Sequence, residues 1–260
     1  MIIDIMTADY LRAFADFLSS DYDISMNTIV TNMTLMRTVC NWVRKQGVTN
    51  NDPFFGYDMP KALYGTPYFL TIQERDQVLD ADLTDDAELS EYRDMFVFQC
   101  MVGCRHSDLV TFTPKNIIDG VLEYIPIKTK GKSGDVVRVP LIPKAMAILD
   151  GHDHGDDEPI FPKHYNFKFN DAIRRILKRA KVNRVVTVIN PKTRLEEKKP
   201  ISDVATSHLA RRTFIGNLYR MVKDPDLVAS MSGHAKGSVA FARYRVIDDD
   251  MKKSLVELIQ

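Results

Sequence analysis

The sequence has few cysteines, one tryptophan and no long hydrophobic run. Its 260 residues include only Cys40, Cys100 and Cys104, which are too few and too odd in number for a disulfide framework. No run of about 18 apolar residues occurs, so a membrane-spanning helix is not expected. The N-terminus also lacks the charged segment followed by an apolar segment that marks a secretion signal. These absences predict a cytoplasmic protein with no membrane partner.

The net charge is zero, because 35 basic residues balance 35 acidic ones. Domains that bind polyanions are usually basic, so this balance argues weakly against a general polyanion binder. The charges are nevertheless segregated: six basic residues lie between positions 174 and 184, and acidic residues gather at 150–158 and 248–250. Such segregation can produce one basic and one acidic face, and an ordinary solvated surface explains it equally well.

Local patterns predict a helical first block at residues 1–58. Apolar residues recur there with helical spacing, and the longer helix is expected from Thr28 to Gln46. Trp42 lies on that helix, and we expect it to pack in the core of the block. Turn-rich residues without a helical period follow, and they predict an interdomain linker at residues 59–68.

The second block, residues 69–260, is predicted to be mostly helical with small β-hairpins. Thr71 and Glu74 form a capping box that indicates its first helix. β-rich runs at 121–127 and 136–141 surround a polar, glycine-containing loop and predict a hairpin. Further elements are expected at 89–102 (a buried helix), 165–180 (a basic amphipathic helix), 185–189 with 195–199 (a second hairpin), 226–232 and 248–259 (short helices). The predicted fold class is therefore mainly α with small β-hairpins.

Five separated side chains in the second block have the chemistry needed to attack a phosphodiester without a metal. Arg105 lies in a Gly-Cys-Arg-His-Ser-Asp-Leu segment at the end of the apolar helix. His208 and Arg211 are three residues apart, so they share one face of a helix that Thr206 or Ser207 would cap. His234 follows a glycine, and Tyr244 comes ten residues later. Arginine forks hold phosphate oxygens, histidines move protons, and a tyrosine oxygen can act as the nucleophile.

Each of these motifs occurs alone in unrelated proteins. A buried Arg105 needs an anion or a carboxylate partner, and an ion pair with Asp108 is the structural alternative to a phosphate site. Cys100, Cys104 and His106 can be interpreted as metal ligands, but the apolar surroundings and the lack of an obvious fourth ligand favour buried thiols. The order of the motifs along the chain is more specific than any one of them.

Taken in order, the chain contains the box around Arg105, a β-hairpin with lysines, the box Thr206–Phe214, Gly-His at 233–234, and Tyr244. This set resembles the tyrosine recombinase (phage integrase) family over nearly the whole chain, and its style is closest to integrases of Bacteroides-type mobile elements or phages. One spacing departs from the family pattern. The histidine and the tyrosine are more often nine residues apart in the family, and here they are ten apart.

The resemblance implies a two-domain DNA clamp. Residues 1–58 would form a helical, SAM-like core-binding domain, residues 59–68 the linker, and residues 69–260 the catalytic domain. The implied function is a site-specific recombinase that cleaves and rejoins DNA through a 3′-phosphotyrosyl intermediate, with no metal or nucleotide cofactor. The implied partners are double-stranded DNA with specific recombination sites, a homotetramer on paired sites, and accessory DNA-bending or directionality factors. The compartment would be the cytoplasm of a bacterium or of a phage-infected host. Whether an arm-binding domain, which many members carry, has been removed stays open.

The catalytic residues that the resemblance implies are Arg105, Lys128, His208, Arg211, His234 and Tyr244. The position of the lysine depends on the direction of counting. Counting forward through the strand after Gly120 favours Lys128, which we prefer, and counting back from Pro140 favours Lys132. Lys130 is expected on the other side of the ribbon.

Two other function classes stay open. A type IB topoisomerase-like enzyme uses similar residues to relax supercoils, and a non-cleaving module would bind specific DNA without cutting it. The complete residue set argues against the non-cleaving module. The short chain and the style of the boxes favour recombination over relaxation.

Overall fold

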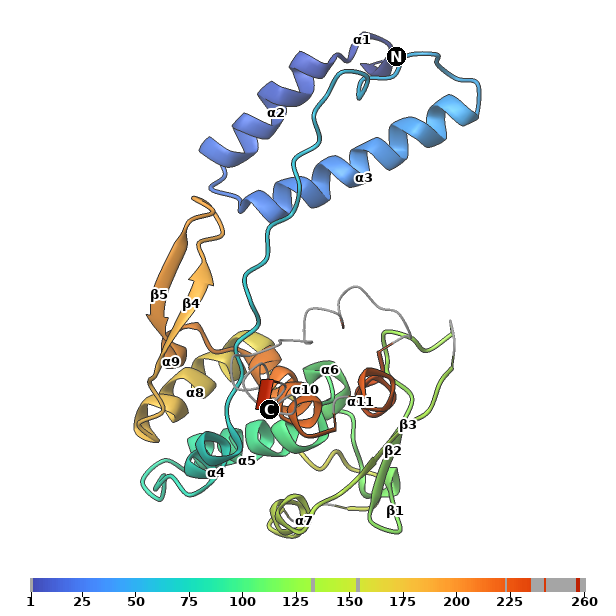
Figure 1. Cartoon of the computed structure of the whole chain (residues 1–260). Coiled ribbons are helices and arrows are strands. Elements are labelled where there is room, and N and C mark those ends of the chain that lie inside the picture. Colours follow the sequence, from blue (N-terminus) through green and yellow to red (C-terminus); the bar gives the residue numbers. More distant parts are fainter. Residues whose placement is uncertain are drawn as a thin grey trace. The chain divides into compact units, whose positions relative to one another are not determined.

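The computed structural model describes residues 2–131, 134–152, 155–222, 224–234, 241 and 256–257. These residues are mainly helical, with a three-stranded antiparallel sheet and a two-stranded sheet, which confirms the predicted fold class (Figure 1). The chain divides into two compact units. One unit contains Met1–Gly65 with Thr187–Lys198, and the other contains Thr66–Val186 with Lys199–Gln260.

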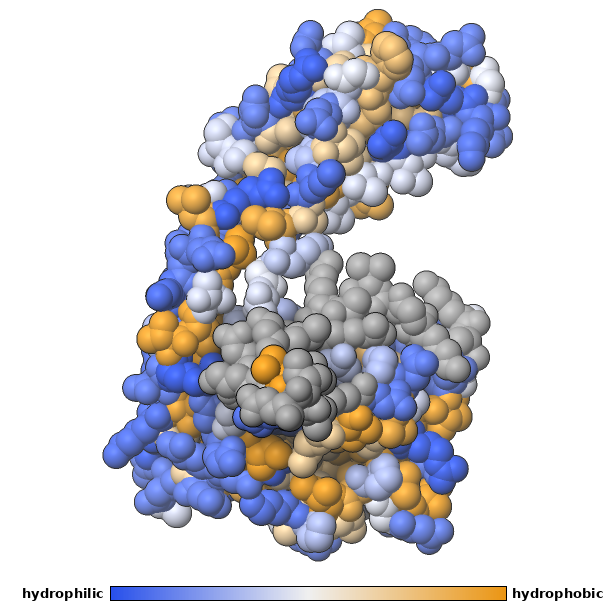
Figure 2. Space-filling model, in the orientation of Figure 1, coloured by the Kyte–Doolittle hydropathy of each residue, from blue (hydrophilic) through white to orange (hydrophobic). Residues whose placement is uncertain are grey.

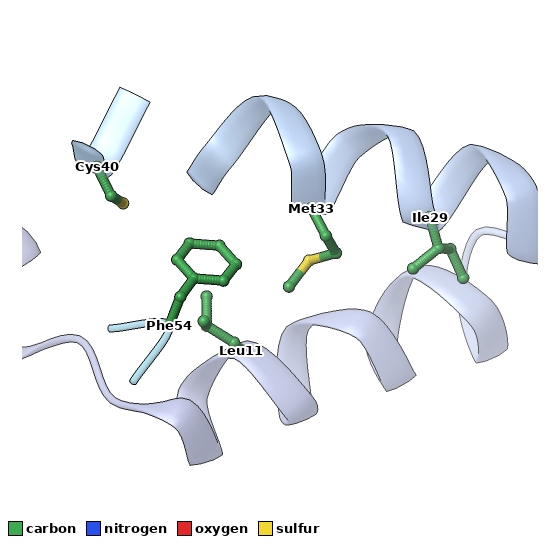
Figure 3. Packing of buried hydrophobic residues seen from close by; sticks show 5 residues of the cluster. All are labelled: Leu11, Ile29, Met33, Cys40 and Phe54. Carbon is green, nitrogen blue, oxygen red and sulfur yellow. The ribbon is translucent and has the colours of Figure 1, made fainter. Parts of the chain in front are cut away.

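The first unit is built on three helices. They are α1 (Ile2–Ile5), α2 (Ala8–Ser20) and α3 (Met26–Lys45). The helix α3 begins two residues before the predicted start, because the Ser25 side chain accepts a hydrogen bond from the backbone N–H of Thr28 and caps it. An apolar cluster joins α2, α3 and the loop after α3 (Figure 3); its buried members are Leu11, Ile29, Met33, Cys40 and Phe54.

The prediction that Trp42 packs in this core is wrong. Trp42 is 60% exposed, whereas its neighbour Val43 is buried. A step of one residue turns an α-helix by about 100°, so Trp42 lies beside the buried stripe rather than within it. It belongs to an outer face of α3 that also exposes Leu35 and Val39.

A hairpin tip from late in the chain, residues 187–198, completes the first unit. The backbone N–H of Met26 donates to the Pro191 carbonyl at 3.1 Å, and Lys192 forms an ion pair with Asp23. Arg194 donates from Nη2 to the carbonyl of Lys61 at 2.8 Å. From the sequence alone, residues 187–198 are assigned to the second block. Local patterns predict the hairpin itself but not the distant segment that its tip contacts.

The second unit is built around the buried helix α5 (Ala87–Val102). Its other helices are α4 (Ile72–Leu79), α6 (His106–Leu109), η1 (Pro114–Asn116), α7 (Pro143–Asp150), α8 (Asn166–Arg179), α9 (Ile201–Val204), α10 (Ser207–Val222) and α11 (Pro225–Ser232). Helices α4, α7, α8 and α10 all contact α5, and α10 does so most extensively. The predicted capping box of Thr71 and Glu74 is present at the start of α4. The predicted helix at 248–259 lies largely outside the described residues.

The strands β1 (Ile117–Ile118), β2 (Val121–Tyr124) and β3 (Val137–Pro140) form the antiparallel sheet, and β4 (Val185–Ile189) pairs with β5 (Glu196–Pro200). Leu122 and Tyr124 of β2 pair with Val139 and Val137 of β3, and all four side chains are buried. The strand β2 ends three residues before the predicted end, since Pro126 interrupts the ladder and its carbonyl accepts from the N–H groups of residues 129 and 130.

In the space-filling view, hydrophilic residues cover much of the visible described surface, and hydrophobic residues are scattered between them (Figure 2). None of the described helices is both long enough and apolar enough to pass through a membrane.

Candidate active site

The corner that carries Arg105 is formed where α5 meets α6. Gly103 ends α5 in a left-handed conformation, with φ of 70°, and its N–H donates to the Gln99 carbonyl. A Cβ atom at Gly103 would lie 2.2 Å from the ring of Phe214, so both the backbone conformation and the packing of α10 require glycine. Arg105 is the residue before α6 and has an extended backbone conformation. The direction of its side chain therefore depends on this turn between α5 and α6 and not on the geometry of either helix.

The side chain of Arg105 is only loosely paired. It is 25% exposed, and its Nη1 lies 4.0 Å from Oδ2 of the buried Asp108. Neither of these two atoms has a hydrogen-bond partner among the described residues. The Arg105–Asp108 ion pair, which the sequence offered as the alternative to a phosphate site, is therefore too long for a hydrogen bond. A buried guanidinium N–H without a partner is costly, and an incoming anion would relieve that cost.

Arg211 is the opposite case, because it is 2% exposed. Its Nη1 donates to the carbonyl of Gly103 at 2.7 Å, and its Nη2 lies 3.1 Å and 3.2 Å from the two ring nitrogens of His234. The neighbouring Arg212 turns elsewhere, with its guanidinium 5.2 Å from the ring centroid of Tyr68. The geometry thus distinguishes the two consecutive arginines, and only Arg211 lies against His234.

His234 follows the end of α11, where Gly233 adopts a left-handed conformation with φ of 64°. The His234 backbone N–H donates to the Ala229 carbonyl and so fixes the position of the residue. Its Nδ1 lies 2.9 Å from the hydroxyl of Ser232, and Phe241 packs on its ring at 5.2 Å between centroids. Helices α10 and α11 contact each other, and α10 runs along α5, which brings three motifs distant in sequence together (Figure 1).

Electrostatics link His208 to the same group. Partial loss of water around the ring lowers the pKa of His208 to about 4, although one side of the residue stays exposed; the charges of Arg212, Arg211 and Arg105 add to the effect. Desolvation also lowers the pKa of His234 to about 3, helped by Arg211, Arg105, His208 and Lys128. Both histidines are therefore neutral at pH 7.

Lys128 lies in a turn rather than at a strand end. Residues 127–131 form this turn after β2, and Lys128 is exposed there. The N–H of Ile127 donates to Oδ1 of Asp108 at 2.9 Å, which ties the turn to the corner of Arg105. Lys130 lies in the same turn, so strand alternation does not decide its direction. The alternative Lys132 and the predicted nucleophile Tyr244 both lie outside the described residues.

Two other sequence-based hypotheses have structural outcomes. All three cysteines are free and buried, and burial raises the pKa of the Cys100 and Cys104 thiols, as expected for core residues. No group of potential metal ligands occurs among the described residues. The basic stretch at 174–184 is largely neutralised, because carboxylates pair with most of its cations; the pairs are Arg174–Asp171, Arg175–Asp86, Lys178–Asp203, Arg179–Asp85 and Arg184–Glu74.

Sequence reasoning missed two contributors to the site. The Gly103 carbonyl accepts from Arg211, and the Ser232 hydroxyl contacts His234. A backbone acceptor leaves no trace in side-chain patterns. The sequence holds a weak indication of Ser232. It lies two residues before His234, and the glycine between them turns the chain at the end of the helix, so the two side chains can meet.

Known proteins share this arrangement of elements. A family model described as the phage integrase family matches residues 68–251. No curated protein sequence matches the chain significantly. Among solved structures, Tn1549 transposon integrase (residues 82–397, in complex with a circular intermediate DNA) has a TM-score of 0.70 at 15% identity, over 99% of this chain and 87% of that one. Lambda integrase (residues 75–356, a dimer bound to a COC′ core site) has a TM-score of 0.67 at 14% identity, over 95% and 82%.

A third structure, XerH recombinase bound to its difH substrate, has a TM-score of 0.63 at 15% identity, over 99% of this chain and 72% of that one. At these identities the structures establish the fold, and the family model, which spans most of the chain, establishes the membership. The family predicted from the spaced motifs is thereby confirmed. The chain belongs to the phage integrase family and is a site-specific tyrosine recombinase.

Proposed function

We propose that this recombinase cleaves and rejoins double-stranded DNA at specific sites through a 3′-phosphotyrosyl intermediate. The observation that carries the proposal is the cluster of Arg105, Arg211, His208 and His234, in which two arginines and two neutral histidines influence one another's charge. Two guanidinium groups match the negative oxygens of a phosphodiester, and Arg105 is partly exposed and only loosely paired, with its Nη1 4.0 Å from Oδ2 of Asp108.

The proposed cleavage step is an in-line displacement at phosphorus. The phenolic oxygen of Tyr244 forms a bond to the phosphorus as the bond from phosphorus to the 5′ oxygen breaks. Arg105 and Arg211 stabilise the charge on the non-bridging oxygens. The Tyr244 proton goes to His208, and Lys128 protonates the departing 5′ oxygen. Rejoining runs these transfers in reverse with a new 5′ hydroxyl, so the energy of the original bond is conserved.

His208 suits the role of proton acceptor because it is neutral at pH 7. A free tyrosine titrates near pH ~10, so its proton must be taken up as the phosphorus bond forms. A bound phosphate brings negative charge next to His208 and raises its affinity for that proton. His234 would donate a hydrogen bond to the same phosphate.

We propose that the reaction needs no metal and no nucleotide cofactor, because two arginines and a lysine supply the positive charge that Mg²⁺ supplies in other phosphoryl transfers. Covalent capture of DNA should therefore proceed in EDTA at the same rate, within about twofold, as in buffer with MgCl₂. Capture that EDTA abolishes and Mg²⁺ restores would contradict the metal-free mechanism.

We further propose that residues 1–58 bind DNA as a separate domain, that both units grip the duplex as a clamp, and that four copies assemble on paired sites. Tn1549 integrase, lambda integrase and XerH are each seen bound to DNA, and lambda integrase as a dimer, which supports DNA binding by this chain. Accessory DNA-bending or directionality factors would act on that assembly.

The nucleophile is tested with a suicide substrate, a duplex nicked close to the cleavage site so that the covalent complex is trapped. Inverted repeats flanking the native gene supply the candidate sequences. Wild-type protein should form an adduct that survives denaturation, and Tyr244→Phe should form none while binding the same DNA with unchanged affinity. Tyr165→Phe is the matched control, because Tyr165 is 74% exposed and lies outside the cluster; it should capture DNA normally.

The pattern of capture also separates the alternatives. Capture at one defined sequence supports the recombinase. Capture at many sequences together with relaxation of supercoiled plasmid would favour a topoisomerase-like enzyme. Specific binding without any capture would favour the non-cleaving module, and an adduct that persists in Tyr244→Phe would overturn the assignment of the nucleophile.

A further inference from the structure

The hydroxyl of Ser232 lies between the end of α11 and the ring of His234. Ser232 is fully buried, and its Oγ is 2.9 Å from Nδ1 of His234. The same oxygen is 2.9 Å from the carbonyl oxygen of Val228 and 3.2 Å from that of Ala229. One hydroxyl hydrogen therefore has three neighbours to which it could be donated.

The chemistry of those neighbours decides where the hydrogen goes. Carbonyl oxygens only accept, so a hydroxyl that donated to His234 would turn its own lone pairs towards two carbonyl oxygens. A hydroxyl that donates to Val228 instead leaves a lone pair of Oγ directed at Nδ1. His234 then completes the chain by donating from Nδ1–H to Ser232. This arrangement keeps the Oγ lone pairs from facing carbonyl oxygens alone, and the reverse one does not.

The position of Arg211 does not by itself indicate which ring nitrogen of His234 carries the hydrogen. Its Nη2 is nearly equidistant from them, at 3.1 Å from Nδ1 and 3.2 Å from Nε2, and a guanidinium group can only donate. With the hydrogen of His234 on Nδ1, Nε2 is the ring nitrogen that can accept from Arg211. The three side chains then form one directed series, in which Arg211 donates to His234, His234 to Ser232, and Ser232 to the α11 backbone.

We propose that Ser232 is a positioning residue that holds His234 in the Nδ1–H tautomer, which leaves Nε2 as the ring nitrogen that accepts from Arg211. The consequence for cleavage rests on the function proposed above. Before DNA binds, His234 orients Arg211 by accepting its hydrogen bond. Once a phosphate is present, its negative charge favours a second proton on Nε2, which then donates to the phosphate, while Nδ1–H stays on Ser232 throughout.

The tautomer can be read directly, without DNA, from imidazole ¹⁵N chemical shifts in protein with labelled histidine at pH 7. The wild type should show His234 protonated at Nδ1. Ser232→Ala removes the acceptor and should shift the ring towards the Nε2–H form, and Ser232→Cys, with a similar volume and a weaker acceptor, should give an intermediate mixture. Ser230→Ala is the matched control: this serine is on the same helix, but its hydroxyl donates to the Leu227 carbonyl.

The second measurement is the rate of covalent capture in a single turnover. Ser232→Ala should slow capture about tenfold with DNA affinity unchanged within twofold, in the range expected when the group that orients a functional histidine is lost. Finding Nε2–H in the wild type, or Nδ1–H unchanged in both Ser232 variants, would overturn the proposal. If Ser232→Ala does not fold, the Ser232→Cys spectrum decides. A wild type that captures no DNA would overturn the proposed function and leave the tautomer assignment to stand or fall on the ¹⁵N spectra.

Discussion

The corner at Arg105 and the α10 helix at Arg211 supply the same chemical group in contrasting ways. Arg211 is buried to 2% exposure and donates both to the Gly103 carbonyl and to His234. Arg105 is 25% exposed, and its Nη1 lies 4.0 Å from Oδ2 of Asp108. One guanidinium is thus part of the core before any ligand arrives, and the other keeps unused hydrogen-bonding capacity. The difference teaches that one active site can combine a preorganised cation with one that a ligand must complete.

The largest expected effect separates these two arginines by stability rather than by activity. Arg211→Ala should lower the free energy of unfolding by about 3 kcal/mol. It leaves the Gly103 carbonyl and His234 without their hydrogen-bond donor, and it creates a cavity. Arg105→Ala should change it by less than about 1 kcal/mol, since a poorly formed pair contributes little. Both variants should slow covalent capture by at least about 10²-fold. Urea unfolding and single-turnover capture measure the two properties. Equal stability losses in the two variants would break the comparison.

The second effect tests the contact between Gly103, at the corner that carries Arg105, and Phe214 on α10. Gly103→Ala places a methyl group in a left-handed backbone position and 2.2 Å from the Phe214 ring, so a loss of about 2 to 3 kcal/mol is expected. Gly120→Ala is the control, because Gly120 has a similar φ of 74° but open space around it; it should lose about 1 kcal/mol. Phe214→Leu should recover part of the Gly103→Ala loss in a double-mutant cycle, and strict additivity would show that the ring is not the obstacle.

Much of this site was readable from the sequence, because its parts are local. The helix that carries His208 and Arg211, the capping box of Thr71 and Glu74, and the family itself follow from periods and short motifs. Trp42 was misplaced because composition, not angular position on α3, suggested burial. The Gly103–Arg211 and Ser232–His234 contacts depend on how α5, α10 and α11 pack against one another. Patterns of side chains in the sequence do not indicate which backbone carbonyl a distant arginine will contact.

The third effect concerns the neutral histidine that Arg211 contacts. The pKa of His234 is about 3 in the folded protein and near 6.5 when the chain is unfolded. Between these values the unfolded state binds more protons, so stability falls as the pH is lowered from about 6.5. From pH 7 to pH 5.5 the wild type should lose about 1 kcal/mol more than His234→Gln does, measured by urea unfolding of each protein at both pH values. Identical losses would mean that this histidine titrates normally in the fold.

The smallest effect is expected at an arginine with no role in the site. Arg175 on α8 pairs with Asp86 at 2.8 Å, but its side chain is 56% exposed. Water and ions compete with such a pair, so Arg175→Gln should cost about 0.5 kcal/mol in dilute buffer and almost nothing in 0.5 M salt. The loss in Arg211→Ala should persist at the same salt concentration, because burial excludes the screening ions. If salt weakened both effects equally, burial would not be what distinguishes Arg211 from the arginines on the surface.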